Sequence, residues 1–144
     1  MRRILCLLTF AGIALWAADR PDMTGKWLFD SSHAAKLKIS TLEIHQSADS
    51  VEIAEAAGPE SKGKTVHLAC ATSGQQCKIK EAGEQVSFWY NGPALVMMEM
   101  RHGSDIVIKT RLEPSEDGKT LHMQVSHIVP EGKEESYTLT RGGS

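Results

Sequence analysis

The chain has 144 residues, of which 24% are charged and 41% hydrophobic, and its formal net charge is −2 at pH 7. This length fits a single domain. The 16 Lys and Arg residues form no basic run, which makes nucleic acid and anionic membrane surfaces poor candidate partners.

The N-terminus has the pattern of an export signal. Arg2 and Arg3 precede the uncharged stretch Ile4–Trp16, as a basic n-region precedes an apolar h-region. A membrane-spanning helix needs about 20 apolar residues, so this stretch is too short to be one. We therefore predict a signal peptide over residues 1–17, removed after Ala17, and a periplasmic or extracellular protein. An uncleaved anchor is the alternative. Cleavage would take the formal net charge from −2 to −4, because Arg2 and Arg3 are lost.

Two cysteines remain after this cleavage. Cys70 and Cys77 form an even pair, which an oxidising compartment would join. Residues 71–76 between them are polar, contain a glycine and are typical of a hairpin loop. We predict a disulfide across this hairpin. A redox or metal pair is the alternative, but the spacing is not C-x-x-C and no suitable histidine pair accompanies it.

From residue 25 onward, short runs of alternating apolar and polar residues are separated by turn residues at intervals typical of a sandwich or barrel. One helical turn is expected over Asp30–Lys36, with Asp30 or Ser31 as its N-cap. The expected strands lie, in chain order, at residues 25–29, 42–45, 51–53, 66–70, 77–79, 86–90, 94–101, 106–112, 121–127 and 137–141.

The links between these strands are too short for parallel crossovers. We therefore predict an all-β fold, an antiparallel up-and-down meander of 8–10 strands closed into a barrel, because closure hides the sheet edges. A two-sheet sandwich is the alternative. The predicted barrel domain spans residues 25–141, with an N-terminal lead at 18–24 and a tail at 142–144.

Gly25-Lys26-Trp27 forms a G-x-W pattern in the first strand, and the last strand ends at Arg141. This pair resembles the lipocalin arrangement, in which the tryptophan fills the closed end of the barrel and a late arginine packs across its ring. The resemblance implies that the predicted barrel is lipocalin-like and that Trp27 contacts Arg141. Gly25–Asp30, Phe88–Leu95 and Asp117–Leu121 are also similar to secreted bacterial lipocalin-like proteins, most of which have no assigned function.

A set of methionine, aromatic and aliphatic residues on four strands is the candidate ligand-binding wall. Methionine and aromatic side chains adapt to irregular apolar ligands. If they point inward, the wall consists of Phe88, Tyr90, Met98, Met100, Ile108 and Met123. The leading hypothesis is a binding module that holds a small apolar or amphipathic molecule inside the barrel. The alternative is that these side chains fill a small barrel and leave no room.

That assignment places Leu95 and Met97 on the outer face beside Trp89, as an apolar patch for a protein partner. A loop or the lead covering the patch is the alternative. A protein-binding module, such as an inhibitor of an extracellular protease, is therefore a second hypothesis. The chain resembles the small disulfide-bearing barrels of bacterial metalloprotease inhibitors. This resemblance implies that the lead, Ala18–Thr24, would bind the protease. An envelope structural protein without a ligand is the third.

Signals for metal binding and catalysis are weak. His122 and His127 are five residues apart on one expected strand, so they face opposite sides. The chain contains no H-x-H, H-E-x-x-H or G-x-S-x-G pattern and no Gly-rich phosphate loop. We predict no metal, no cofactor and no enzymatic activity.

Overall fold

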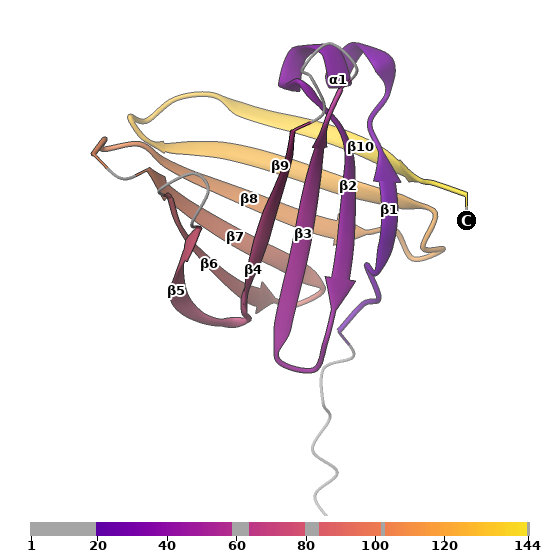
Figure 1. Ribbon diagram of the computed structural model, residues 1–144. Coiled ribbons are helices and arrows are strands. Elements are labelled where there is room, and N and C mark those ends of the chain that lie inside the picture. Colours follow the sequence, from indigo (N-terminus) through magenta and orange to yellow (C-terminus); the bar gives the residue numbers. More distant parts are fainter. Residues whose placement is uncertain (1–19, 59–63, 80–83, 102, 144) are drawn as a thin grey trace, which may run out of the picture.

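The computed structural model describes residues 20–58, 64–79, 84–101 and 103–143. The predicted signal peptide, the first two residues of the lead and Ser144 lie outside the described residues. The described chain forms ten strands and one helix (Figure 1). In chain order these are β1 (Gly25–Leu28), α1 (Ser31–Leu37), β2 (Ile39–Gln46), β3 (Ser50–Ala57), β4 (Thr65–Ala71), β5 (Ser73–Ile79), β6 (Glu84–Asn91), β7 (Ala94–Arg101), β8 (Val107–Pro114), β9 (Thr120–Val129) and β10 (Glu134–Arg141).

All ten strands belong to one antiparallel sheet in the order β4-β3-β2-β1-β10-β9-β8-β7-β6-β5. The first and last strands are neighbours, with Trp27 opposite Arg141. The two ends of the sheet are β4 and β5, which follow each other in the chain. The sheet therefore curls into a nearly closed up-and-down barrel, which confirms the predicted fold class.

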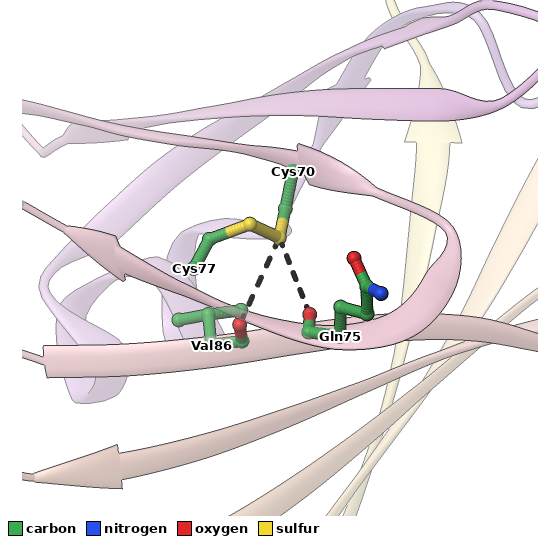
Figure 2. Close-up of a disulfide and its surroundings, with 4 residues drawn as sticks. All are labelled: Cys70, Gln75, Cys77 and Val86. Atoms are coloured by element: carbon green, nitrogen blue, oxygen red, sulfur yellow. Dashed lines mark hydrogen bonds between the residues drawn. A yellow bond between two sulfur atoms is a disulfide. The ribbon is translucent and has the colours of Figure 1, made fainter.

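The gap between β4 and β5, which we call the seam, differs from the expected hairpin. Residues 71–76 were expected to be a loop, but the chain turns at Thr72 and β5 already begins at Ser73. Among the described residues, β4 and β5 share no ladder pairing. Instead, a disulfide joins Cys70 to Cys77, whose Cα atoms are 5.9 Å apart (Figure 2). The disulfide therefore spans a place where the sheet has no backbone hydrogen bonds.

The closed end of the barrel, which we call the floor, is built around Trp27. Its side chain is completely buried, and its Nε1 donates a hydrogen bond to the Met23 carbonyl over 2.9 Å. The guanidinium carbon of Arg141 lies 4.4 Å from the centre of the Trp27 ring. The contact implied by the lipocalin resemblance is therefore present. It supplies a cation–π attraction in addition to the area that it covers.

The described part of the lead packs against the floor. Met23 is completely buried. The Arg20 guanidinium lies 4.7 Å from the centre of the Tyr90 ring, and the Tyr90 hydroxyl accepts a hydrogen bond from Gln46 Nε2 at 2.7 Å. Gln46 Oε1 in turn accepts from the Met23 amide. Residues 20–24 thus form part of the floor.

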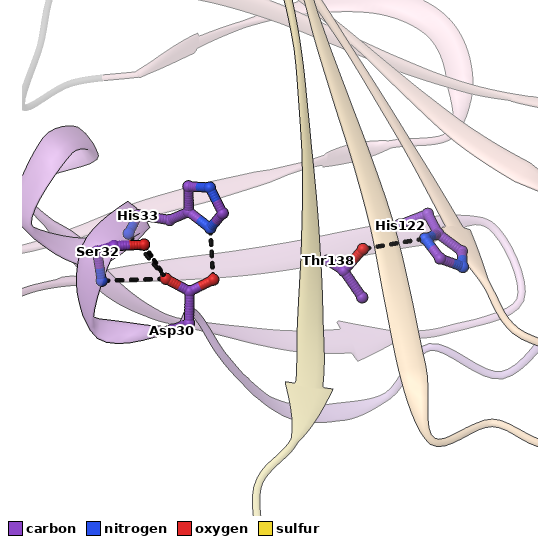
Figure 3. A network of polar contacts seen from close by, with 5 residues as sticks. All are labelled: Asp30, Ser32, His33, His122 and Thr138. Carbon is purple, nitrogen blue, oxygen red and sulfur yellow. Dashed lines mark hydrogen bonds and ion pairs between the residues drawn. The ribbon is translucent and has the colours of Figure 1, made fainter.

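The single helix follows β1 and lies at the opposite end, which we call the mouth. Asp30 caps it by accepting hydrogen bonds from the backbone amides of Ser32 and His33, as the sequence predicted (Figure 3). The helix ends at Lys38, whose carbonyl accepts from the Gly58 amide just after β3. Lys36 makes an ion pair of 2.6 Å with Glu135, near the start of β10. These contacts fix α1 between β3 and β10 at the mouth.

Candidate ligand-binding interior

The interior changes from tightly packed to open along strands β3 and β7. On β7, Leu95 is completely buried, Met97 is 4% exposed, and Glu99 is half-buried. On β3, Val51 and Ile53 are buried, whereas Glu55, the next inward residue, is half-buried. Inward-facing residues that remain partly exposed mean that solvent reaches the interior from the mouth. The barrel is therefore filled at the floor and open above it.

Four of the six predicted wall residues face the interior. Phe88 is completely buried and Met123 is 8% exposed, so both belong to the packed core. Tyr90 is half-buried against the core at the floor end. Ile108 is half-buried and stands opposite Glu99 across the β7–β8 ladder, so it lies on the open part of the wall.

The prediction was wrong for β7. Phe88 stands opposite Met97, and residues directly opposite in an antiparallel ladder lie on the same face. Met97 and Leu95 therefore point inward, while Met98 and Met100 point outward. Because side chains alternate between the two faces of a strand, an inward direction assigned one residue out of place is wrong for every residue of that strand.

The predicted outer patch changes accordingly. Trp89 does face outward and is half-buried, but its neighbours are Val96 on β7 and Ser73 on β5. Val96 is only 1% exposed. Since Leu95 and Met97 belong to the core, the patch that suggested a protein partner does not form as predicted.

Three carboxylates that the sequence interpretation missed face the open half of the interior. Glu55 on β3 continues the inward series of Val51 and Ile53. Glu99 on β7 continues that of Leu95 and Met97, and Glu84 on β6 stands opposite Ile79 of β5. All three are half-buried. We call them the inner carboxylates.

The inner carboxylates affect one another electrostatically. Burial raises the pKa of Glu55 to about 7, and the charge of Glu84 contributes to this rise. Burial also raises the pKa of Glu99 to about 7, with the charges of Glu55 and Glu84 adding to the effect and Arg101 opposing it. Glu55 and Glu99 therefore change their protonation near neutral pH.

Other charged groups stand at the rim of the mouth. Arg101 at the end of β7 makes a 3.3 Å ion pair with Glu84, and His127 faces inward opposite Ile108. Glu135 on β10 accepts hydrogen bonds from Lys36 and from the Tyr137 hydroxyl, which lower its pKa to about 2. The rim beside α1 therefore carries a paired carboxylate, unlike the inner carboxylates of β3 and β7.

His45, His67 and His122 point away from the interior. His45 and His67 are exposed on the outer face, as predicted. His122 also faces outward, where its Nδ1 lies 3.4 Å from the Thr138 hydroxyl (Figure 3). Within residues 20–58, 64–79, 84–101 and 103–143, no three His, Cys, Asp or Glu side chains are grouped to hold a metal ion. No helix in these ranges is long and apolar enough to cross a membrane.

Shallow depressions on the surface of the described residues lie outside the barrel interior. One, of about 330 Å³, lies over the outer face of β8, β9 and β10 and is lined by residues including Arg111, His122 and Gln124. Another, of about 300 Å³, lies between the lead and the β2–β3 turn at the floor. Neither of these two leads to the inner carboxylates.

Comparisons with known proteins match the architecture. No family model matches the chain, and neither does any curated protein. The crystal structure of a mutant of the fluorescent protein UnaG superposes with a TM-score of 0.60 at 12% sequence identity, over 83% of this chain and 96% of that one. At such low identity the likeness shows the fold alone. The chain has a lipocalin-like barrel fold. Strand order and the Trp27–Arg141 contact agree with this assignment.

Proposed function

We propose that this protein is an exported binding module that holds a small amphipathic molecule inside its barrel. The supporting observation is the change along the interior from a packed apolar floor to a half-exposed, partly charged upper wall. Such a wall offers apolar contact on one side and polar groups on the other, which is typical of small-molecule sites. Burial of an apolar ligand segment against Ile108 and Val66 would provide the main favourable free energy.

The inner carboxylates restrict the polar part of the ligand. A ligand anion placed between Glu55 and Glu99 would be repelled in a partly desolvated site. A neutral group that donates hydrogen bonds, or a cation, would satisfy the same carboxylates. The ligand is therefore an amphiphile with a neutral or cationic head.

Calorimetric titration with three amphiphiles of equal chain length tests this proposal. We expect dodecyltrimethylammonium and dodecyl maltoside, each below its micelle concentration, to bind at pH 8, and dodecyl sulfate to bind at least about tenfold more weakly. Glu55→Gln should reduce the difference in affinity between dodecyl sulfate and the other two amphiphiles, because it removes a charge that repels the sulfate. Glu52→Gln, an exposed position on the same strand, is the matched control and should change nothing. If none of the three amphiphiles binds, the proposal is wrong.

The natural ligand can be sought directly by native mass spectrometry of protein gently purified from its own exporting cell. An added mass that disappears on denaturation would give the mass of the ligand. A bare chain in repeated preparations would contradict the carrier role.

Export is part of the proposal. The basic and apolar pattern of residues 1–17 supports it, and so does the pairing of Cys70 with Cys77, since disulfides persist in oxidising compartments. N-terminal sequencing of the native protein should find Ala18 as its first residue. A protein that starts at Met1 in the cytosolic fraction would exclude export.

A further inference from the structure

The seam is the one place among the described strands where consecutive neighbours lack ladder hydrogen bonds. On one side lies β4, with Val66 and Leu68 facing inward, and on the other lies β5, with Cys77 and Ile79 facing inward. A separation of these strands would expose buried apolar side chains, because Leu68 is 1% and Ile79 4% exposed. The seam is thus a lateral boundary between solvent and the barrel interior.

Two connections hold the floor end of the seam. The turn between the strands is anchored by a hydrogen bond of 2.8 Å from the Thr72 amide to the Asp49 carbonyl. The second connection is the disulfide, which joins the strands a short distance above the turn (Figure 2). The turn alone would let β4 and β5 pivot, whereas the disulfide fixes their spacing.

Like charges flank the seam nearer the mouth. Glu55 lies on β3, one strand beyond β4, and Glu84 lies on β6, one strand beyond β5. Each carries negative charge when ionised, and the charge of Glu84 raises the pKa of Glu55, so the two interact across the seam. When both are ionised their charges repel across the seam, and the ion pair of Glu84 with Arg101 offsets part of this repulsion.

We propose that the seam is a second, lateral entrance to the barrel interior beside the open mouth and that the Cys70–Cys77 disulfide keeps it closed. The role as an entrance rests on the proposed function, whereas the closing role of the disulfide does not. A dithiol would open the seam by thiol–disulfide exchange. Its thiolate attacks Sγ of Cys77, the more exposed residue of the pair, and Cys70 leaves as a thiolate that takes up a proton. The second thiol then releases Cys77, so that two cysteine thiols form and the dithiol is oxidised to a cyclic disulfide.

The surroundings of Cys70 suit the reduced form as well. Its Sγ lies 3.6 Å from the Gln75 carbonyl oxygen and 3.8 Å from the Val86 carbonyl oxygen (Figure 2). A disulfide sulfur has no hydrogen to donate, whereas a free thiol can donate weakly to either oxygen. The reduced Cys70 would therefore keep a polar partner on β5 or β6 while β4 gains freedom.

Hydrogen–deuterium exchange of the mature protein, with and without dithiothreitol, tests the closing role without any ligand. We expect amide protection in β4 and β5 to fall by about tenfold or more on reduction, while protection in β8 and β9 changes by less than about twofold. The double variant Cys70→Ser/Cys77→Ser should behave like the reduced protein and should not respond to dithiothreitol. Unchanged protection at the seam would overturn the proposal. So would an equal loss in all strands, because the disulfide would then be a general stabiliser.

The rate of binding of the neutral apolar dye Nile red tests the entrance role. Reduction should raise the association rate constant by about tenfold, because the opened seam adds a wider route to the interior than the mouth alone provides. An unchanged rate together with lost seam protection would show that ligands enter elsewhere and overturn the entrance role. If the dye binds neither form, the proposed function fails, while the exchange result still decides whether the disulfide closes the seam.

Discussion

The guanidinium of Arg141 occupies the space that a side chain at Gly25 would need. A Cβ atom on Gly25 would lie 2.8 Å from Arg141 Nη1, and Gly25 has a φ of +134°, which disfavours other residues. The same guanidinium donates hydrogen bonds to the carbonyls of Thr24 and Gly118, each at 2.8 Å. The glycine of the G-x-W pattern thus makes room for the arginine that covers the tryptophan.

Gly25→Ala should therefore destabilise the barrel. The new methyl group displaces the guanidinium from Trp27, and the alanine must adopt a backbone conformation that is unfavourable for any residue with a side chain. Together these effects cost about 2–3 kcal/mol. Urea unfolding followed by Trp fluorescence measures the effect. Gly143→Ala is the matched control, because a Cβ there meets no atom within 4 Å. Equal midpoints for the two variants would contradict this account of the floor.

The raised pKa values predict how stability depends on pH. The pKa of Glu99 is about 7 in the folded protein against an ordinary value of 4.5, so between these values the folded state holds more protons than the unfolded chain. The free energy of unfolding must then fall as the pH rises from about 4.5 to about 7. Glu55 acts in the same direction.

Glu99→Gln should flatten this pH dependence. We expect it to raise the free energy of unfolding by about 1–2 kcal/mol at pH 8 and to change it little at pH 5, allowing for the partial exposure of the group. Urea unfolding at several pH values measures both effects. Glu116→Gln, an exposed position in the β8–β9 turn, provides the control. If the free energy of unfolding depends on pH in the same way for Glu99→Gln and the unmodified protein, Glu99 is not desolvated.

The inward direction of β7 can be tested by a pair of methionine variants. Met97→Ala removes a core side chain that is 4% exposed and should cost about 2–4 kcal/mol of stability. Met98→Ala removes a half-buried outer side chain and should cost less than about 1 kcal/mol. Urea unfolding measures both losses. A larger loss for Met98→Ala than for Met97→Ala would support the inward direction of Met98 that was first predicted from the sequence.

The attachment of α1 to β10 is testable by exchange. Glu135→Gln replaces the charged partner of Lys36 with a neutral one, so α1 should lose amide protection by about threefold or more, while β8 keeps its protection. Glu131→Gln, exposed in the β9–β10 turn, is the control. Unaltered exchange in α1 would show that its apolar contacts, made by Ala34 and Leu37, are enough to hold it.

The strand order, the single helix and the Trp27–Arg141 contact were predictable from the sequence, because period-two runs and turn residues mark strands locally. The inward face of β7 was also within reach. A two-residue turn at Gly92-Pro93 pairs Asn91 with Ala94, and counting back from this pair places Met97 opposite Phe88. The sequence interpretation recognised the turn but did not count back along the ladder from it.

The inner carboxylates and the seam were harder to predict. Glu55 shares the alternation of Val51 and Ile53, so its inward direction was visible in the sequence, but charged residues in turns and at edges usually serve solubility. That Glu55, Glu84 and Glu99 face one interior depends on how far the sheet curls, which no local pattern encodes. The absence of a β4–β5 ladder among the described residues likewise results from closure of the whole barrel.

The packed floor and the open mouth separate two kinds of sequence constraint within one barrel. Substitutions around Trp27 act on whether the chain folds, whereas those at positions 55, 84 and 99 act on what the interior accepts. Ligand preference can therefore be changed by varying these three mouth positions together, because the residues of the floor, which support folding, stay unchanged.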